Sequence, residues 1–193
     1  MRFFAGLIVG VLLVAVVPAA LLMSGMFNMG AMNQPSELER RVGTWAWQTS
    51  AQKNAPTMKN PFTTDITLDD GLDHYKENCV TCHGAPGVEK SEIGKGLNPP
   101  APMLDSPVVV ERTDGEIFWT IKNGVRMTGM PAFGPTHSDE EIWKIVQFVR
   151  HLPQLTEKEK TELQESAEEE EHHHGKSEEG EHTGHSHPET HHH

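Results

Sequence analysis

The sequence is poor in cysteine, in aromatic residues and in positive charge, and each shortage excludes a class of protein. Two cysteines in 193 residues are too few for a scaffold held together by disulfides. The 16 lysines and arginines stand against 28 aspartates and glutamates, and the net charge of −12 argues against a nucleic-acid partner, which would need a basic face. Hydrophobic residues make up 36% of the chain and aromatic residues 6%. We therefore expect a thin core that needs a further source of stability.

One long apolar run is present, from Phe3 to Met23. As a helix it would measure about 32 Å, against about 30 Å for the hydrocarbon core of a bilayer. Residues 1–23 are therefore predicted to be a transmembrane anchor. Because Arg2 keeps the N-terminus cytoplasmic, the rest of the chain is expected on the periplasmic or extracytoplasmic side. The alternative is a cleaved signal peptide, with small residues around Val17-Pro18-Ala19 as the cleavage site.

Residues 24–68 are predicted to form a tether between this run and a folded domain. A short amphipathic helix is expected from about Pro35 to Ser50, because its apolar residues have helical spacing. These residues are Leu38, Val42 and Trp45. Trp45 and Trp47 are expected either at a membrane interface, where tryptophan is favoured, or packed on the folded domain.

The other end of the chain, residues 156–193, is predicted to be an acidic, His-rich tail. Thr156 and Glu159 have the spacing of a capping box, so the tail is expected to begin as a helix. After Ser166 no apolar periodicity remains, and such a stretch cannot bury enough surface to offset the entropy of ordering it. Most of the tail is therefore predicted to be disordered.

Residues 69–155 are predicted to be the folded domain, and its patterns indicate helices. One helix is expected from about Asp69 to Cys82 and a second from Thr113-Asp114 to Gly124. A third begins at Ser138 as N-cap, with Glu141 three residues later, and is stopped by Pro153. Its inward side chains are Ile142, Ile145, Val146, Val149 and Leu152. Since Val108–Val110 is too short to assign as a strand, the fold class is all-α.

The segment Cys79-Val80-Thr81-Cys82-His83 has the C-x-x-C-H pattern of covalent haem attachment. At a helix end, two thiols with this spacing reach two vinyl groups on one edge of a porphyrin, and the following imidazole lies beneath the iron. A structural zinc site would need further ligands, and a thioredoxin-like dithiol would need a βαβ context. One covalent haem c is therefore predicted on Cys79 and Cys82, with His83 as an axial ligand of the iron.

Four downstream side chains are candidates for the second axial ligand. They are Met103, Met127, Met130 and His137. Met130 is favoured because it lies in a stiff loop, in which Gly129 permits close backbone approach and Pro131 fixes the exit direction. Met127 is the second choice.

These motifs resemble those of class I monohaem c-type cytochromes, over about residues 69–155. The resemblance includes Gly71 and Tyr75 before the C-x-x-C-H motif, the Thr-Gly-Met-Pro loop and a C-terminal helix containing Trp143. It implies a small all-α fold around the haem, in which Gly71 allows the first and last helices to cross closely. It also implies that Tyr75 packs against the stretch from Trp143 to Phe148. It further implies a proline carbonyl that accepts the Nδ1 proton of His83; the candidate stretch is Asn98–Pro102, with Pro99 or Pro100 as the proline, unless these form a plain turn.

A haem with His/Met ligation has no open position, so the expected function is one-electron transfer between membrane-associated redox complexes, not enzymatic catalysis. The tether would let the domain swing while it stays near both partners. If Met130 is not a ligand, the alternative is a five-coordinate haem enzyme or a ligand-binding haem protein. A further alternative is binding of copper or another transition metal by the tail histidines. These are His172, His173, His174, His182, His185, His187, His191, His192 and His193.

Overall fold

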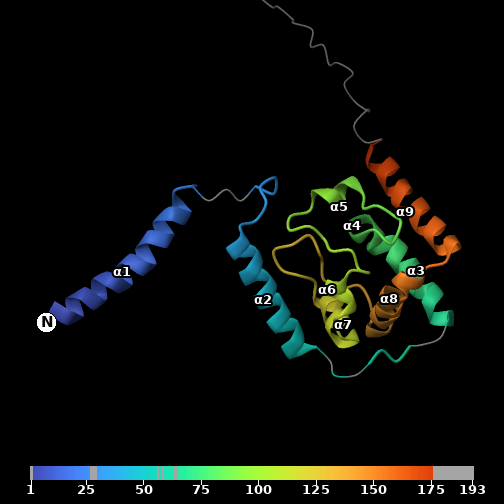
Figure 1. Cartoon of the computed structure of the whole chain (residues 1–193), viewed down its shortest axis with the longest axis horizontal. Coiled ribbons are helices and arrows are strands. Elements are labelled where there is room, and N and C mark those ends of the chain that lie inside the picture. Colours follow the sequence, from blue (N-terminus) through green and yellow to red (C-terminus); the bar gives the residue numbers. More distant parts are fainter. Residues whose placement is uncertain (1, 27–29, 56, 58, 63–64, 176–193) are drawn as a thin grey trace, which may run out of the picture.

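The computed structural model describes residues 2–26, 30–55, 57, 59–62 and 65–175, and Figure 1 shows how they are arranged. These residues are helices joined by loops. Their only β pairing is an isolated bridge between Ala85 and Val88. The described chain therefore fits the predicted all-α fold.

The N-terminal apolar run forms helix α1, Arg2–Met23. Its large apolar side chains are exposed, including Phe4, Val14 and Met23. Among the described residues, no helix combines the length and the apolar character that crossing a membrane requires. The predicted anchor is not confirmed and stays a prediction.

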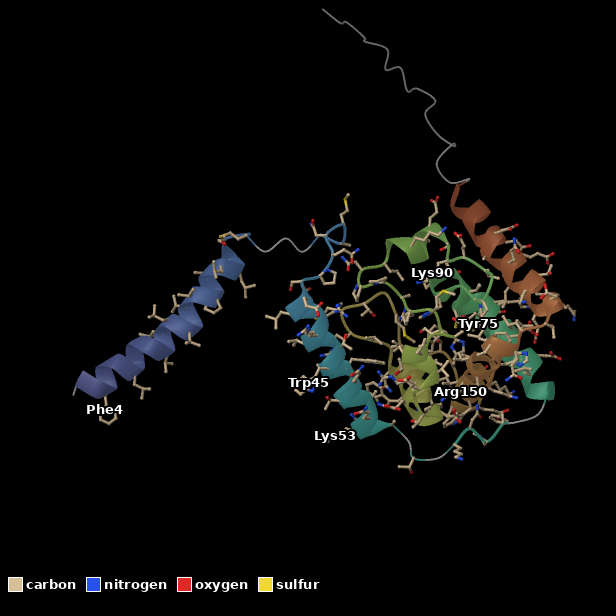
Figure 2. The ribbon with its side chains drawn as sticks, in the orientation of Figure 1. Phe4, Trp45, Lys53, Tyr75, Lys90 and Arg150 are labelled. Atoms are coloured by element: carbon tan, nitrogen blue, oxygen red, sulfur yellow. The ribbon has the colours of Figure 1, made fainter. Side chains whose placement is uncertain are left out.

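Helix α2, Glu37–Asn54, begins at a capping box made by Ser36 and Glu39. Its inner side is docked on the folded domain: Ala51 is fully buried, and the Arg112 guanidinium lies 4.6 Å from the centre of the Trp47 ring. Trp45 is 67% exposed and points away from the domain (Figure 2). The two tryptophans therefore differ, because only Trp47 packs on the domain.

The chain before α2 is also fixed to the domain. The side-chain amide of Asn98 donates hydrogen bonds to the carbonyls of Ala31, at 2.7 Å, and Asn33, at 2.6 Å. Residues 31–54 thus lie along the domain, whereas the sequence suggested a segment that leaves the domain free to swing.

Helices α3, Asp65–Asn78, and α8, Asp139–His151, form the centre of the domain and cross at Gly71. A Cβ at Gly71 would lie 2.5 Å from the backbone oxygen of Lys144 and 2.9 Å from Cβ of Phe148. One turn later the Tyr75 ring lies 5.2 Å from the Phe148 ring. The close crossing and the Tyr75 packing that the resemblance implies are both present.

Helix α7, Asp114–Asn123, has Thr113 as N-cap and Gly124 as C-cap, as expected. It follows the single turn α6, Pro107–Val110, which is helical. Arg150 of α8 joins the two: its Nε donates to Oδ1 of Asp114 at 2.8 Å, and its Nη1 to the Val110 carbonyl at 2.8 Å. The Phe118 and Trp143 rings stack 4.3 Å apart between α7 and α8. As predicted, the five inward side chains of the third helix are buried.

After α8 and the short 3-10 helix η1, Leu152–Gln154, the chain continues as α9, Glu157–Gly175. The predicted disorder after Ser166 is wrong for residues 167–175, which are helical. Leu163 and Ala167, four residues apart, are buried against α3 and α4 and supply an apolar contact that the sequence pattern did not reveal. The tail from residue 176 onward lies outside the described residues, so metal binding there stays a prediction.

Candidate functional site

The C-x-x-C-H motif consists of Cys79, which separates two helices, and the single helical turn that follows it. The sequence predicts one helix through Cys82, but α3 ends at Asn78 and the four-residue helix α4, Val80–His83, begins after Cys79. The amides of Cys82 and His83 both donate to the Cys79 carbonyl, at 3.1 and 2.8 Å. This turn brings both thiols and the imidazole into one compact unit.

Gly84 ends this turn with φ at +63°, in the region that favours glycine. A Cβ there would lie 2.7 Å from the Val88 carbonyl. The buried Tyr75 hydroxyl donates a 2.6 Å hydrogen bond to the Gly84 carbonyl. Tyr75 therefore connects the α3–α8 crossing directly to the end of the C-x-x-C-H turn.

The two thiols differ in environment. Cys79 is buried, and burial raises its pKa to about 12. Cys82 is partly exposed; burial also raises its pKa, while the positive charge of Lys90 acts in the opposite direction. Neither cysteine is in a disulfide, so both are free to form thioethers.

Helix α5, Glu92–Gly96, supports the motif from outside. The amide and the hydroxyl of Ser91 both donate to the Thr81 carbonyl, at 3.1 and 2.9 Å. The Ser91 hydroxyl also accepts the amide of Gly94, where a Cβ would lie 2.5 Å from the Thr81 carbonyl. The sequence did not predict this support, because a serine three residues before a glycine is only a weak capping signal.

The His83 side chain is buried, and its Nδ1 lies 2.8 Å from the Pro102 carbonyl. Because a carbonyl only accepts, Nδ1 must carry the proton, which leaves the Nε2 lone pair available. Burial lowers the pKa of His83, and the nearby Lys90 charge also lowers it, against the effect of the hydrogen bond to Pro102. The ring is therefore held neutral, in the form that binds a metal. The acceptor lies in the stretch that the resemblance implied, but it is the carbonyl of Pro102 and not that of Pro99 or Pro100.

The loop that carries Met130 is fixed by its own hydrogen bonds. The Thr128 hydroxyl donates to the Val125 carbonyl at 2.7 Å and accepts the Met130 amide at 3.1 Å. The Met130 carbonyl accepts the Val125 amide at 3.2 Å. Gly124, with φ at +64°, lies so close to Pro131 that a Cβ would come within 2.6 Å of its carbonyl carbon. These hydrogen bonds and the close approach of Gly124 to Pro131 are the contacts that a stiff loop requires.

The four candidates for the second axial position have different surroundings. Met130 is partly buried and packs against the hydrophobic core, whereas Met127 is 81% exposed. Met103 is half-buried and lines a hollow beside Lys90 and Val88. The His137 ring contacts the His74 ring, with 5.3 Å between their centres.

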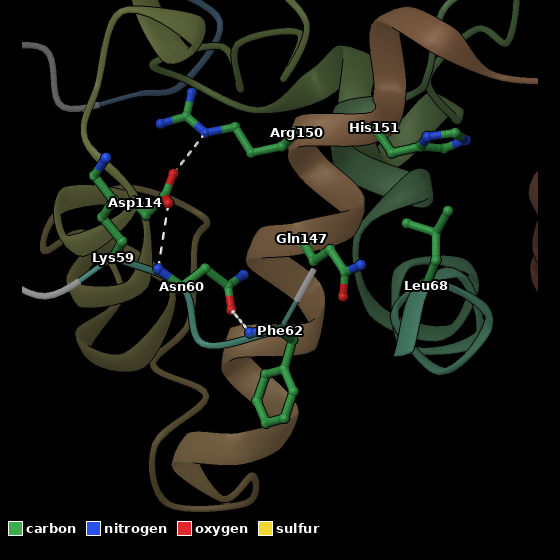
Figure 3. A pocket seen from close by; sticks show the side chains of 8 residues that line it. All are labelled: Lys59, Asn60, Phe62, Leu68, Asp114, Gln147, Arg150 and His151. Carbon is green, nitrogen blue, oxygen red and sulfur yellow. Dashed lines mark hydrogen bonds and ion pairs between the residues drawn. The ribbon is translucent and has the colours of Figure 1, made fainter. Parts of the chain in front are cut away.

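A second hollow, of about 360 Å³, lies at the far end of α8 and is not lined by any residue of the predicted site (Figure 3). Asn60 closes one side of this hollow. Its backbone N–H donates to the Asp114 carboxylate, and its side-chain amide donates to the Trp143 carbonyl at 2.6 Å. This hollow marks where the end of the tether docks on the domain.

Comparison with known proteins agrees with the motif. Residues 67–149 match the family described as Cytochrome C oxidase, cbb3-type, subunit III. A search of curated proteins found no match. The family match supports a c-type cytochrome domain, which implies a haem cofactor and suggests haem-based electron transfer.

Proposed function

We propose that this protein is a one-electron carrier with a single haem c, bound through Cys79 and Cys82 and ligated by His83 and Met130. The observation that carries the proposal is the arrangement at α4. Two free thiols and a buried imidazole lie in one turn, with Nδ1 of His83 committed to Pro102 and Nε2 left for a metal.

The residues present fit a haem of this kind. Both free thiols and the buried imidazole lie within five consecutive residues at α4, and the same region contributes buried apolar side chains such as Val80 and Val88, as a nonpolar macrocycle requires. When bound, the haem iron supplies the redox centre that accepts and releases one electron. The protein contributes a fixed imidazole, because the bond to Pro102 sets the ring orientation and raises its basicity.

Met130 as the second ligand is supported by its partial burial and by the hydrogen-bonded loop around it. A thioether held in a hydrogen-bonded loop loses little entropy on ligation, whereas the Met127 side chain is 81% exposed. A methionine ligand favours the ferrous state and raises the reduction potential. With His83 and Met130 both bound, the iron would have no ligand position left for oxygen or peroxide, which favours a carrier over an enzyme.

We further propose that the domain works at the extracytoplasmic face of a membrane and exchanges electrons with membrane redox complexes. The exposed apolar side chains of α1 support the location. The family description, which names an oxidase subunit, supports a redox complex as partner.

The ligation is tested by replacing Met130 with alanine and recording the absorption spectrum of the purified ferric protein. We expect the wild type to have a low-spin spectrum with a methionine–iron charge-transfer band near the red end, and M130A to lose that band and bind carbon monoxide when reduced. M127A is the matched control and should keep the band. A wild-type protein that is high-spin, or that binds carbon monoxide readily, would favour the enzyme or ligand-binding alternative.

A further inference from the structure

The loop that accepts the proton of His83 has few means of holding itself in place. Three of the five residues in Asn98–Pro102 are prolines, at positions 99, 100 and 102. Proline has no backbone N–H to donate. Within the part of the chain that the structure describes, no backbone–backbone hydrogen bond outside the helices involves residues 98–102. Backbone hydrogen bonding resumes at Met103, whose carbonyl accepts the Ser106 amide, so the hydrogen bonds that hold the loop between Asn98 and Met103 come from side chains.

Lys90 supplies one of these side chains. Its Nζ donates a hydrogen bond to the carbonyl of Ala101, the residue directly before Pro102. His83 binds the next carbonyl, and Asn98 ties the start of the loop to residues 31 and 33. Two successive carbonyls of the loop are thus held from the chain around α4: that of Ala101 by the Lys90 ammonium, and that of Pro102 by the His83 imidazole.

The location of Lys90 in the chain explains why it reaches this loop. It follows the narrow turn closed by the Ala85–Val88 bridge and directly precedes Ser91, which is bonded to the Thr81 carbonyl. Lys90 is therefore fixed at its base to the α4 turn, and it lies beside α4 and α5 in Figure 2. Its side chain joins the two segments that carry the donor and the acceptor of the His83 bond.

We infer that Lys90 is a positioning residue for the proximal imidazole: by holding the Ala101 carbonyl it places the Pro102 carbonyl on Nδ1 of His83. The inference deepens the proposed function and rests on His83 being an iron ligand. Without Lys90, the bond from His83 is the one hydrogen bond that stays on residues 99–102 in the described part of the chain, while Asn98 and Met103 remain bonded on either side. We therefore expect the Nδ1 proton to become more accessible to water.

The test is the exchange rate of the His83 Nδ1 proton with solvent, measured by NMR on holoprotein labelled with ¹⁵N-histidine. K90M keeps the aliphatic stem but removes the donor, and we expect the proton to exchange at least several-fold faster. K90R retains a donor and a charge, and should restore a rate near that of the wild type.

K95M is the matched control. Lys95 lines the same hollow and pairs with Glu89 at 2.8 Å, so this variant removes the same charge without removing the bond to Ala101. In K95M the exchange rate of the His83 Nδ1 proton should stay at the wild-type value. The backbone amides of α8 should exchange at wild-type rates in all three variants. An unchanged Nδ1 exchange rate in K90M, or an equal increase in K95M, would overturn the inference. A wild-type protein without covalently bound haem would instead contradict the proposed function.

Discussion

Replacing Gly71 with alanine would test how closely α3 and α8 must approach at the centre of the domain. The added Cβ would lie 2.5 Å from the Lys144 oxygen and 2.9 Å from Cβ of Phe148. The first contact is with backbone, so it cannot be relieved by rotating a side chain. The helices must therefore separate by roughly an ångström, at a cost of about 1–3 kcal/mol for overpacking.

Alanine also has the higher helix propensity, which returns about 1 kcal/mol. Because the closest contact is with backbone, we expect the overpacking cost to lie in the upper part of its range, about 2–3 kcal/mol, so that G71A loses about 1–2 kcal/mol of stability in total. For a domain of this size that corresponds to a fall in Tm of roughly 5–15 °C. The assay is thermal unfolding of the holoprotein, monitored by circular dichroism.

Gly43 in α2 provides the control, because a Cβ at that position meets nothing within 4 Å. G43A should leave the stability of the domain unchanged or raise it slightly through helix propensity. A G71A protein as stable as the wild type would refute the reasoning that the crossing requires glycine.

Two further predictions concern α9 and the start of α8. L163A removes a fully buried side chain between α9 and the domain and should cost about 2–5 kcal/mol in urea unfolding, whereas Q164A on the exposed side should cost little. Hydrogen bonds from Ser138 hold the pKa of Glu141 below its usual value of 4.5, so its stabilising contribution is complete above about pH 4.5 and is lost as the pH falls through the lower folded value. E141Q should reduce the loss of stability between pH 5 and pH 3, and E140Q should leave this pH dependence closer to that of the wild type.

Much of the domain could be predicted because its signals are local. Ser138 and Glu141, or Thr113 and Gly124, mark helix ends within a few residues of themselves, and the spacing of apolar residues identifies the buried face of α8. The C-x-x-C-H motif is equally local. The resemblance then supplied two contacts between distant segments, at Gly71 and at Tyr75.

What could not be predicted depends on contacts between distant segments that no local pattern records. The break at Cys79 separates α3 from α4 although the sequence favours one continuous helix. The choice of Pro102 among the residues of its loop depends on where Lys90 and His83 hold that loop. Likewise, the apolar face of α9 consists of little more than Leu163 and Ala167. So narrow a face cannot be recognised from the sequence without knowledge of the helices on which it packs.

The docking of residues 31–54 shortens the stretch of chain that lies between the domain and the end of α1. Were all of residues 24–68 free, the fully extended chain would span about 150 Å. Because the chain from Ala31 onward is fixed to the domain, residues 24–30 are what separates the end of α1 from the docked segment, and seven residues span at most about 25 Å. If the domain acts as the proposed carrier, its redox partner would be met close to α1, and an exchange of electrons over a longer distance would require α2 to detach first.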